Sequence, residues 1–224
     1  MPVNDFILSI YDIVVFATMS YSIYLYIWKK NTKKQRYFYI YIGAVFFLDI
    51  VPAYLFKSWI NINQFYLYYS LLLITILYFV YFYLNDYKDK FNRIILVSLA
   101  ILSLVFIVFF QMQEDSLVIS SNLFLILIIY QLALALQWFW YIVNHADEQN
   151  IIHKQAFWVS CALLLWSTFA LFRMYPMYDL SKTDAGFLNT VIDVFNVVNI
   201  ITYLLYIRGL RCTDYNILRT FNHF

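Results

Sequence analysis

Residues 187–207, FLNTVIDVFNVVNIITYLLYI, form a run of 21 residues that contains a single charged residue. An apolar segment of about 20 residues is long enough to cross the hydrocarbon core of a bilayer as an α-helix. Six further segments of this kind precede it, at residues 6–28, 37–56, 65–84, 94–110, 117–143 and 155–175, of which 94–110 is the shortest. The sequence therefore predicts an all-α bundle of seven transmembrane helices, multi-pass in a plasma membrane, with a bacterial inner membrane as the first expectation.

Composition supports this class. The chain is 64% hydrophobic and 12% charged, whereas a soluble domain is nearer half apolar and a quarter charged. The loops between the segments are short, so we expect one transmembrane domain over residues 1–207. Residues 208–224 are expected to form a short, basic, amphipathic cytoplasmic tail.

The distribution of lysine and arginine predicts the orientation of the chain. Twelve of these residues fall in the tail and in the loops after the first, third and fifth segments, whereas three fall on the other side. Positive residues concentrate on the cytoplasmic side of membrane proteins. The N-terminus is therefore expected outside and the C-terminus in the cytoplasm. In the tail, Arg208, Arg211 and Arg219 are expected to contact anionic lipid or a cytoplasmic protein partner.

Four charged residues lie inside the predicted segments. At a rise of 1.5 Å per residue, Asp12, Asp49 and Asp193 fall about 10 Å below the outer surface, and Arg173 lies near the same end of its segment. Ionisable residues inside membranes are costly and usually face protein or water. Asn189 and Asn196 share a helical face with Asp193. We expect these six residues to line one polar pocket open to the outside, with separate snorkelling or capping of each charge as the alternative.

Several functional classes lack the residues that they need. No lysine lies in the last segment, which excludes a conventional retinal protein, and no histidine and aspartate cluster lies at membrane level. His145, Glu148 and His153 fall in predicted loops, where a solvated loop is favoured over a metal site. Motifs such as GxSxG and HExxH do not occur. We therefore expect no enzyme, no cofactor, no metal and no nucleic-acid partner, and no disulfide between Cys161 and Cys212.

Two segments share a local pattern that suggests internal repeats. FFLDIVPAY (46–54) and ALFRMYPMY (170–178) each place a charge three residues before proline and a tyrosine two residues after it. The first three and the last three segments would then be parallel repeats, joined by the fourth. This topology, with Pro52 and Pro176, resembles that of small sugar transporters with proline-kinked repeats. Residues 49–72, DIVPAYLFKSWININQFYLYYSLL, resemble small uncharacterised seven-helix proteins of Bacteroidota type.

Three functions fit these features. The first is a receptor-like or sensory membrane subunit, with an outward polar pocket for a small molecule and a separate cytoplasmic protein partner. The second is a transporter of a small polar solute built from two three-helix repeats. The third is a structural or accessory membrane subunit. A transporter needs a polar path through the inner half of the membrane, and the inner halves of the segments carry no charge, which favours the first.

Overall fold

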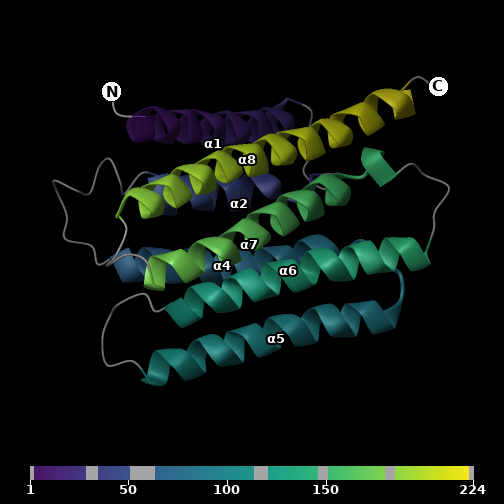
Figure 1. The fold of residues 1–224 in the computed structure, drawn as a ribbon. Helices are drawn as coiled ribbons and strands as arrows, with labels where there is room; N and C mark the ends of the chain where they lie inside the picture. Colours follow the sequence, from purple (N-terminus) through teal and green to yellow (C-terminus); the bar gives the residue numbers. More distant parts are fainter. Residues whose placement is uncertain are drawn as a thin grey trace. The chain divides into compact units, whose positions relative to one another are not determined.

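The computed structural model of the chain describes residues 3–28, 35–50, 64–113, 121–145, 151–179 and 185–221. Every regular element in these ranges is a helix (Figure 1), which confirms the all-α class for the described part. The long helices are α1 (Val3–Ile27), α4 (Gln64–Leu84), α5 (Lys90–Gln113), α6 (Ser121–Asn144), α7 (Gln155–Asp179) and α8 (Ala185–Phe221). The short ones are α2 (Phe38–Val45), the π-helix η1 (Phe46–Ile50) and the 3₁₀-helix η3 (Ile151–His153).

Six of these helices, α1 and α4 to α8, are long and apolar enough to cross a membrane, which fits a polytopic membrane protein. The predicted segment 37–56 corresponds to α2 and η1. Its apolar helical part, Phe38–Leu48, is too short to span a bilayer alone, and residues 51–63 lie outside the described ranges. The seventh span and the orientation of the termini therefore stay predictions.

The prediction that the fourth segment is the shortest was wrong. Helix α5 has 24 residues and begins at Lys90, four residues before the predicted start. Asp89 accepts hydrogen bonds from the backbone N and the side-chain Nδ2 of Asn92, at 3.1 and 2.8 Å, which is the geometry of an N-cap. The Nε of Arg93 donates to the carbonyl of Tyr87, at 2.7 Å, so its side chain turns back toward the loop. Charged residues in the first turn therefore do not end this helix.

Helix α8 is longer than the predicted last segment. It runs without a break for 37 residues and passes the boundary predicted between the transmembrane domain and the tail, at residue 207. The division into residues 1–207 and 208–224 stays a prediction, but α8 continues across this boundary as far as Phe221. At 1.5 Å per residue α8 is about 55 Å long, whereas a bilayer core is about 30 Å thick.

The described helices belong to two compact units. One unit combines Met1–Tyr39 with Asp147–Phe224 and contains α1, α7 and α8; the other, Ile40–Ala146, contains α4, α5 and α6. The predicted repeats would instead join the first three segments and the last three. The units thus divide the chain differently and give the repeat hypothesis no support.

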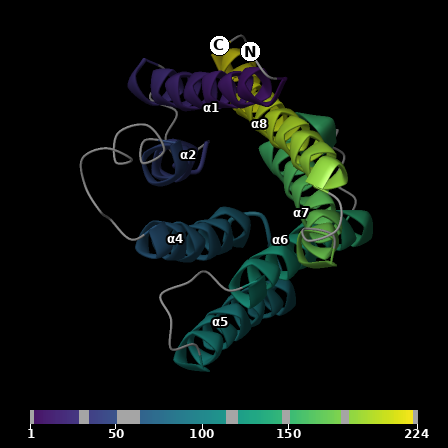
Figure 2. The same ribbon diagram turned by 60° about the vertical axis from the view of Figure 1, so that its left-hand side comes forward.

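In the first unit, α7 buries a face that is made mostly of small side chains. The buried face of α7 carries residues spaced by three and four positions, namely Ala156, Ser160, Leu163, Ser167 and Ala170. Small residues let helices in a membrane approach each other closely. Helix α8 lies against α7 and also contacts α1 (Figures 1 and 2).

In the second unit, large aromatic side chains fill the space among α4, α5 and α6. Phe79 and Tyr83 of α4 and Trp138 of α6 are fully buried. The Tyr130 hydroxyl of α6 donates to the carbonyl of Ile76 in α4, at 2.9 Å. Buried tyrosine and tryptophan usually satisfy their polar atoms in this way.

Candidate functional site

The polar face predicted for the last segment lies on α8. Asp193 and Asn196 are half-buried, whereas Asn189 is exposed. Asp193 takes part in an interaction within the structure, so its charge is not free. The sequence analysis missed the next polar residue toward the C-terminus, Asn199, whose Oδ1 accepts a hydrogen bond from Nε1 of Trp166 in α7, at 2.9 Å. Polar residues of α8 thus also contribute to the contact with α7.

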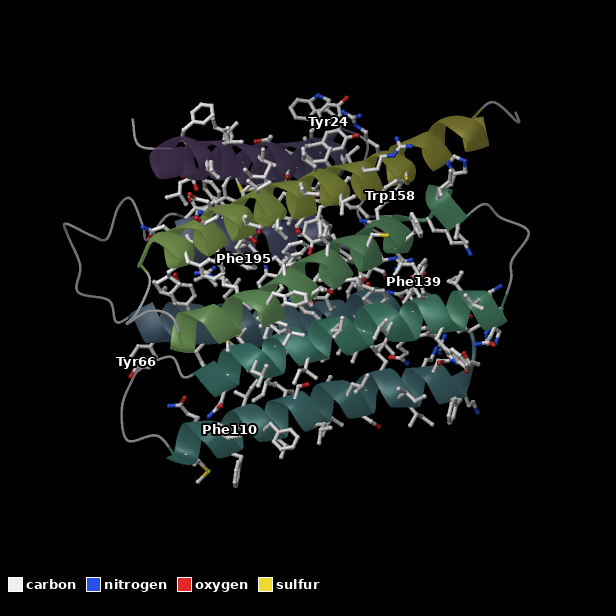
Figure 3. The ribbon with its side chains drawn as sticks, in the orientation of Figure 1. Tyr24, Tyr66, Phe110, Phe139, Trp158 and Phe195 are labelled. Carbon is white, nitrogen blue, oxygen red and sulfur yellow. The ribbon has the colours of Figure 1, made fainter. Side chains whose placement is uncertain are left out.

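Arg173 of α7 lies over the ring of Phe195 in α8. Its Cζ is 4.6 Å from the ring centroid, which is a cation–π arrangement. The ring of Trp166 lies on Phe195 as well, at a centroid distance of 5.9 Å (Phe195 is labelled in Figure 3). The Nε of Arg173 is buried and has no hydrogen-bond partner among the described residues. A half-buried guanidinium with an unused donor is suited to an anion or a hydrogen-bond acceptor.

The other two predicted acids, Asp12 and Asp49, are described only in part. Asp12 is half-buried in α1 and has an interaction of its own. It follows Tyr11, whose ring contacts Tyr203 of α8 at a centroid distance of 5.7 Å. Asp49 lies in the π-helix η1, and its side chain is outside the described part. A single pocket lined by all six predicted residues therefore stays a prediction.

The basic end of α8, which we define as Arg208, Arg211 and Arg219, is described in part. Arg208 and Arg211 are exposed, whereas the side chain of Arg219 lies outside the described part. The Cζ of Arg208 lies 5.4 Å from the ring centroid of Trp158. Trp158 itself donates from Nε1 to the carbonyl of Ile152, at 2.8 Å (Trp158 is labelled in Figure 3). The start of α7 and η3 thus hold one arginine of the basic end.

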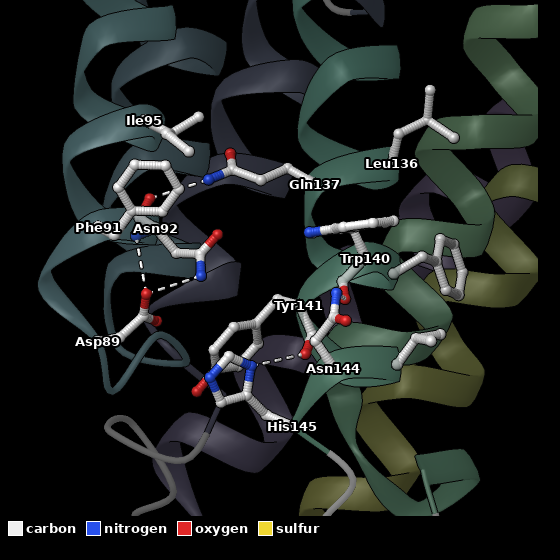
Figure 4. A pocket seen from close by; sticks show the side chains of 12 residues that line it. Asp89, Phe91, Asn92, Ile95, Leu136, Gln137, Trp140, Tyr141, Asn144 and His145 are labelled. Carbon is white, nitrogen blue, oxygen red and sulfur yellow. Dashed lines mark hydrogen bonds between the residues drawn. The ribbon is translucent and has the colours of Figure 1, made fainter.

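A cavity that the sequence analysis did not anticipate lies in the second unit, where α5 begins and α6 ends. It is an open groove of about 760 Å³. Its apolar walls include Ile95 of α5 and Leu136 of α6, and its polar lining includes Asp89, Asn92, Gln137, Asn144 and His145 (Figure 4). The charge distribution predicts this end to be cytoplasmic, whereas the predicted pocket was to open outward.

Hydrogen bonds fix the polar wall of this groove. The Nε2 of Gln137 donates to the carbonyl of Asn92, at 2.9 Å, and this bond joins α6 to α5. The backbone N of Lys88 donates to the hydroxyl of Tyr141, at 3.1 Å. Tyr141 also stacks on the ring of His145, at 4.5 Å between centroids. The loop before α5 is therefore held against the last turns of α6.

The electrostatics at this end favour a charged Asp89 and a neutral Tyr87. Partial burial acts to raise the pKa of Asp89, but the hydrogen bonds from Asn92 and the nearby His145 outweigh it, so the pKa lies below its ordinary value. Burial raises the pKa of Tyr87, and the carboxylate of Asp86 raises it further. Asp89 is thus a carboxylate at neutral pH.

No group of three or more His, Cys, Asp or Glu residues that could hold a metal ion is found in the described part of the chain. Cys161 and Cys212, both described, are free thiols. Comparison of the chain with known protein families, with curated proteins and with solved structures finds no match.

Proposed function

We propose that this polytopic membrane protein is a receptor-like or sensory subunit. The observation that carries the proposal is the continuity of α8, whose 37 residues reach from the polar face at Asn189, Asp193 and Asn196 to the basic end. About 20 residues suffice to cross the bilayer core. One rigid helix thus provides both a membrane span and an extension of several turns.

The polar end of this helix offers chemistry for a small anionic ligand. Arg173 supplies a cation with an unused Nε donor, and its guanidinium lies over the ring of Phe195. Asn196 is half-buried on α8 and supplies a further donor and acceptor. Because Arg173 lies near the end of its span, a ligand from the side predicted to be outside would not need to cross the membrane core.

The basic end offers a surface for output. Arg208 and Arg211 are exposed on the same helix, on the side predicted to be cytoplasmic. A ligand that pulls α8 relative to α7 at Phe195 would change the position of Arg208 against Trp158. Such a movement is a change of packing between two helices, which is a common switching device.

The test uses the full chain in lipid nanodiscs and a panel of small anions: acetate, succinate, phosphate and glutamate. Thermal unfolding is followed by tryptophan fluorescence, and backbone hydrogen exchange is measured over residues 208–221. We expect at least one anion to raise the unfolding temperature and to change exchange in this distant stretch. Arg173→Gln should abolish both effects, whereas Lys182→Gln, which removes a positive charge on the same predicted side, should leave them intact.

Four outcomes would overturn the proposal. If no anion acts, or if Arg173→Gln responds as the unmodified chain does, the ligand site is not at Arg173. If stabilisation occurs without any change over residues 208–221, α8 does not couple the two ends. If the stabilising anion accumulates in proteoliposomes, the transporter alternative replaces the receptor.

A further inference from the structure

The groove between α5 and α6 has the form of a site for an amphipathic molecule. Its apolar wall continues along two helices that are suited to span the membrane. Two large side chains at its edge are widely exposed, Phe91 at 70% and Trp140 at 69%. Exposed aromatic rings of this kind are typical of the membrane interface. The groove thus joins an apolar face to a polar end at the level where lipid headgroups lie.

The polar end of the groove contains two buried acceptor atoms that receive no hydrogen bond from the described residues. The Oδ1 of Asp89 and the Oε1 of Gln137 have no hydrogen-bond partner among the described residues. The second polar atom of each group already makes a hydrogen bond, since Oδ2 of Asp89 caps α5 and Nε2 of Gln137 donates to the carbonyl of Asn92. A carboxylate oxygen and an amide oxygen can only accept. The complementary group therefore carries several N–H donors and a positive charge.

Positive side chains flank this carboxylate. Lys88 and Lys90 are exposed on either side of Asp89 in the sequence, and His145 is close enough to lower the pKa of Asp89. This alternation of sign matches a zwitterion better than an anion, because an anionic group alone would be repelled by Asp89.

We propose that this groove binds a phospholipid with an ethanolamine headgroup. Its primary ammonium donates to Asp89 and Gln137, its phosphate lies toward Lys88 and Lys90, and an acyl chain lies along Ile95 and Leu136. The two acceptor atoms are shielded from water, so on binding the ends of both side chains turn and exchange their present hydrogen bonds with Asn92 for bonds to the ammonium. A choline headgroup has the same charge but no N–H donor, so it cannot replace ethanolamine here.

This site lies in the second unit and does not depend on the function proposed for α8. The experiment uses the full chain, delipidated in detergent, and phospholipids with identical acyl chains and ethanolamine, choline or glycerol headgroups. Native mass spectrometry measures the fraction of protein that carries bound lipid. We expect the ethanolamine lipid to bind at least about tenfold more tightly than the choline lipid, as is typical of a charged hydrogen bond that is made or lost.

The variant Asp89→Asn removes the charge and keeps a good N-cap, so the start of α5 is preserved. It should lower the preference for ethanolamine by about tenfold. Asp147→Asn, which changes the net charge equally in the loop after α6, should leave the preference unchanged. Gln137→Met is the second variant and should lower the preference to a smaller extent, because a neutral acceptor is lost.

The outcomes distinguish a specific lipid-binding site from general contact with lipid. Equal binding of ethanolamine and choline lipids would overturn the proposal and would assign the bound lipid to the general surface. Tighter binding of the glycerol lipid would also overturn the proposal, because lysines and arginines, and not Asp89, would then select the headgroup. An ethanolamine preference that survives both Asp89→Asn and Gln137→Met would also overturn it, because the lipid would then lie elsewhere.

Discussion

Gly209 lies where α8 approaches the start of α7, and its replacement tests that contact directly. A Cβ atom at this position would lie 3.3 Å from the carbonyl oxygen of Gln155 and 3.3 Å from the Cβ of Trp158. Neither atom can rotate away, because one belongs to the backbone and the other is attached to it. Helix α7 must therefore shift to accept even one methyl group.

The expected magnitude follows from two opposing terms. Alanine in a helix is favoured over glycine by about 0.8–1 kcal/mol, whereas overpacking a tight contact costs about 1–3 kcal/mol. We expect Gly209→Ala to lower the free energy of unfolding by about 1 kcal/mol, and Gly209→Leu to lower it by more than about 2 kcal/mol. Gly43 in α2 is the matched control, because within the described part of the chain no neighbouring atom lies within 4 Å of a Cβ placed there. Gly43→Ala should stabilise the chain by about 0.5–1 kcal/mol.

Thermal unfolding in detergent, followed by tryptophan fluorescence, measures these differences. For a chain of this size 1 kcal/mol corresponds to about 2–4 °C in the unfolding temperature. We expect a decrease for Gly209→Ala and an increase for Gly43→Ala. Equal increases for both would refute the close contact between α7 and α8, because only helix preference would then act at Gly209.

Three further predictions concern other parts of the chain. Tyr130→Phe removes the hydrogen bond to α4 and should lower stability to chemical denaturation by about 1 kcal/mol; unchanged stability would show that the bond is not formed. A reporter fused after Phe224 should read cytoplasmic and one inserted at residues 114–116, after the end of α5, should read external, whereas the reverse signals would invert the orientation. Replacing the three arginines of the basic end with glutamine should leave insertion intact but weaken lipid or partner binding by about 1 kcal/mol per arginine. Unchanged binding in a pull-down and in a lipid-binding assay would show that the basic end makes no contact.

The helices could be predicted from the sequence because apolar runs of membrane length carry a strong local signal. Their ends were less predictable. Lys90 and Arg93 looked like a loop, yet an N-cap at Asp89 starts α5 before them. Arg208 and Arg211 looked like the start of a tail, yet α8 continues through them. Charged residues end an apolar run, but they do not end a helix, since backbone hydrogen bonding does not depend on side-chain polarity.

The candidate sites were less predictable because they depend on which helices meet. The bond between Trp166 and Asn199 joins residues 33 positions apart, and no local pattern indicates it. The groove likewise needs the start of α5 beside the end of α6. Two local signals were present: Asp89 and Asn92 have the spacing of a cap, and Tyr141 of α6 lies four residues before His145. Spacing of this kind shows which residues share a face, but not what that face meets.

The last prediction concerns the contact between Arg173 and Phe195. A cation–π contact is worth about 0.5 kcal/mol when exposed and about 2 kcal/mol when desolvated, and Arg173 is half-buried. Arg173→Gln loses this contact, but it also removes a buried Nε that has no partner among the described residues, and the loss of that desolvation cost offsets part of the effect. We therefore expect Arg173→Gln alone to change the free energy of unfolding by less than about 1 kcal/mol.

The double-mutant cycle isolates the contact, because the packing of the Phe195 ring on Trp166 is lost in both backgrounds and cancels. Phe195→Leu should cost about 0.5–2 kcal/mol more with Arg173 present than in the Arg173→Gln background. Losses that add within about 0.5 kcal/mol would show that the ring does not hold the cation. Coupling of Arg173→Gln to Asp193→Asn in its place would assign the arginine to an ion pair on α8. The anion site proposed at Arg173 would then be occupied by a carboxylate of the chain itself.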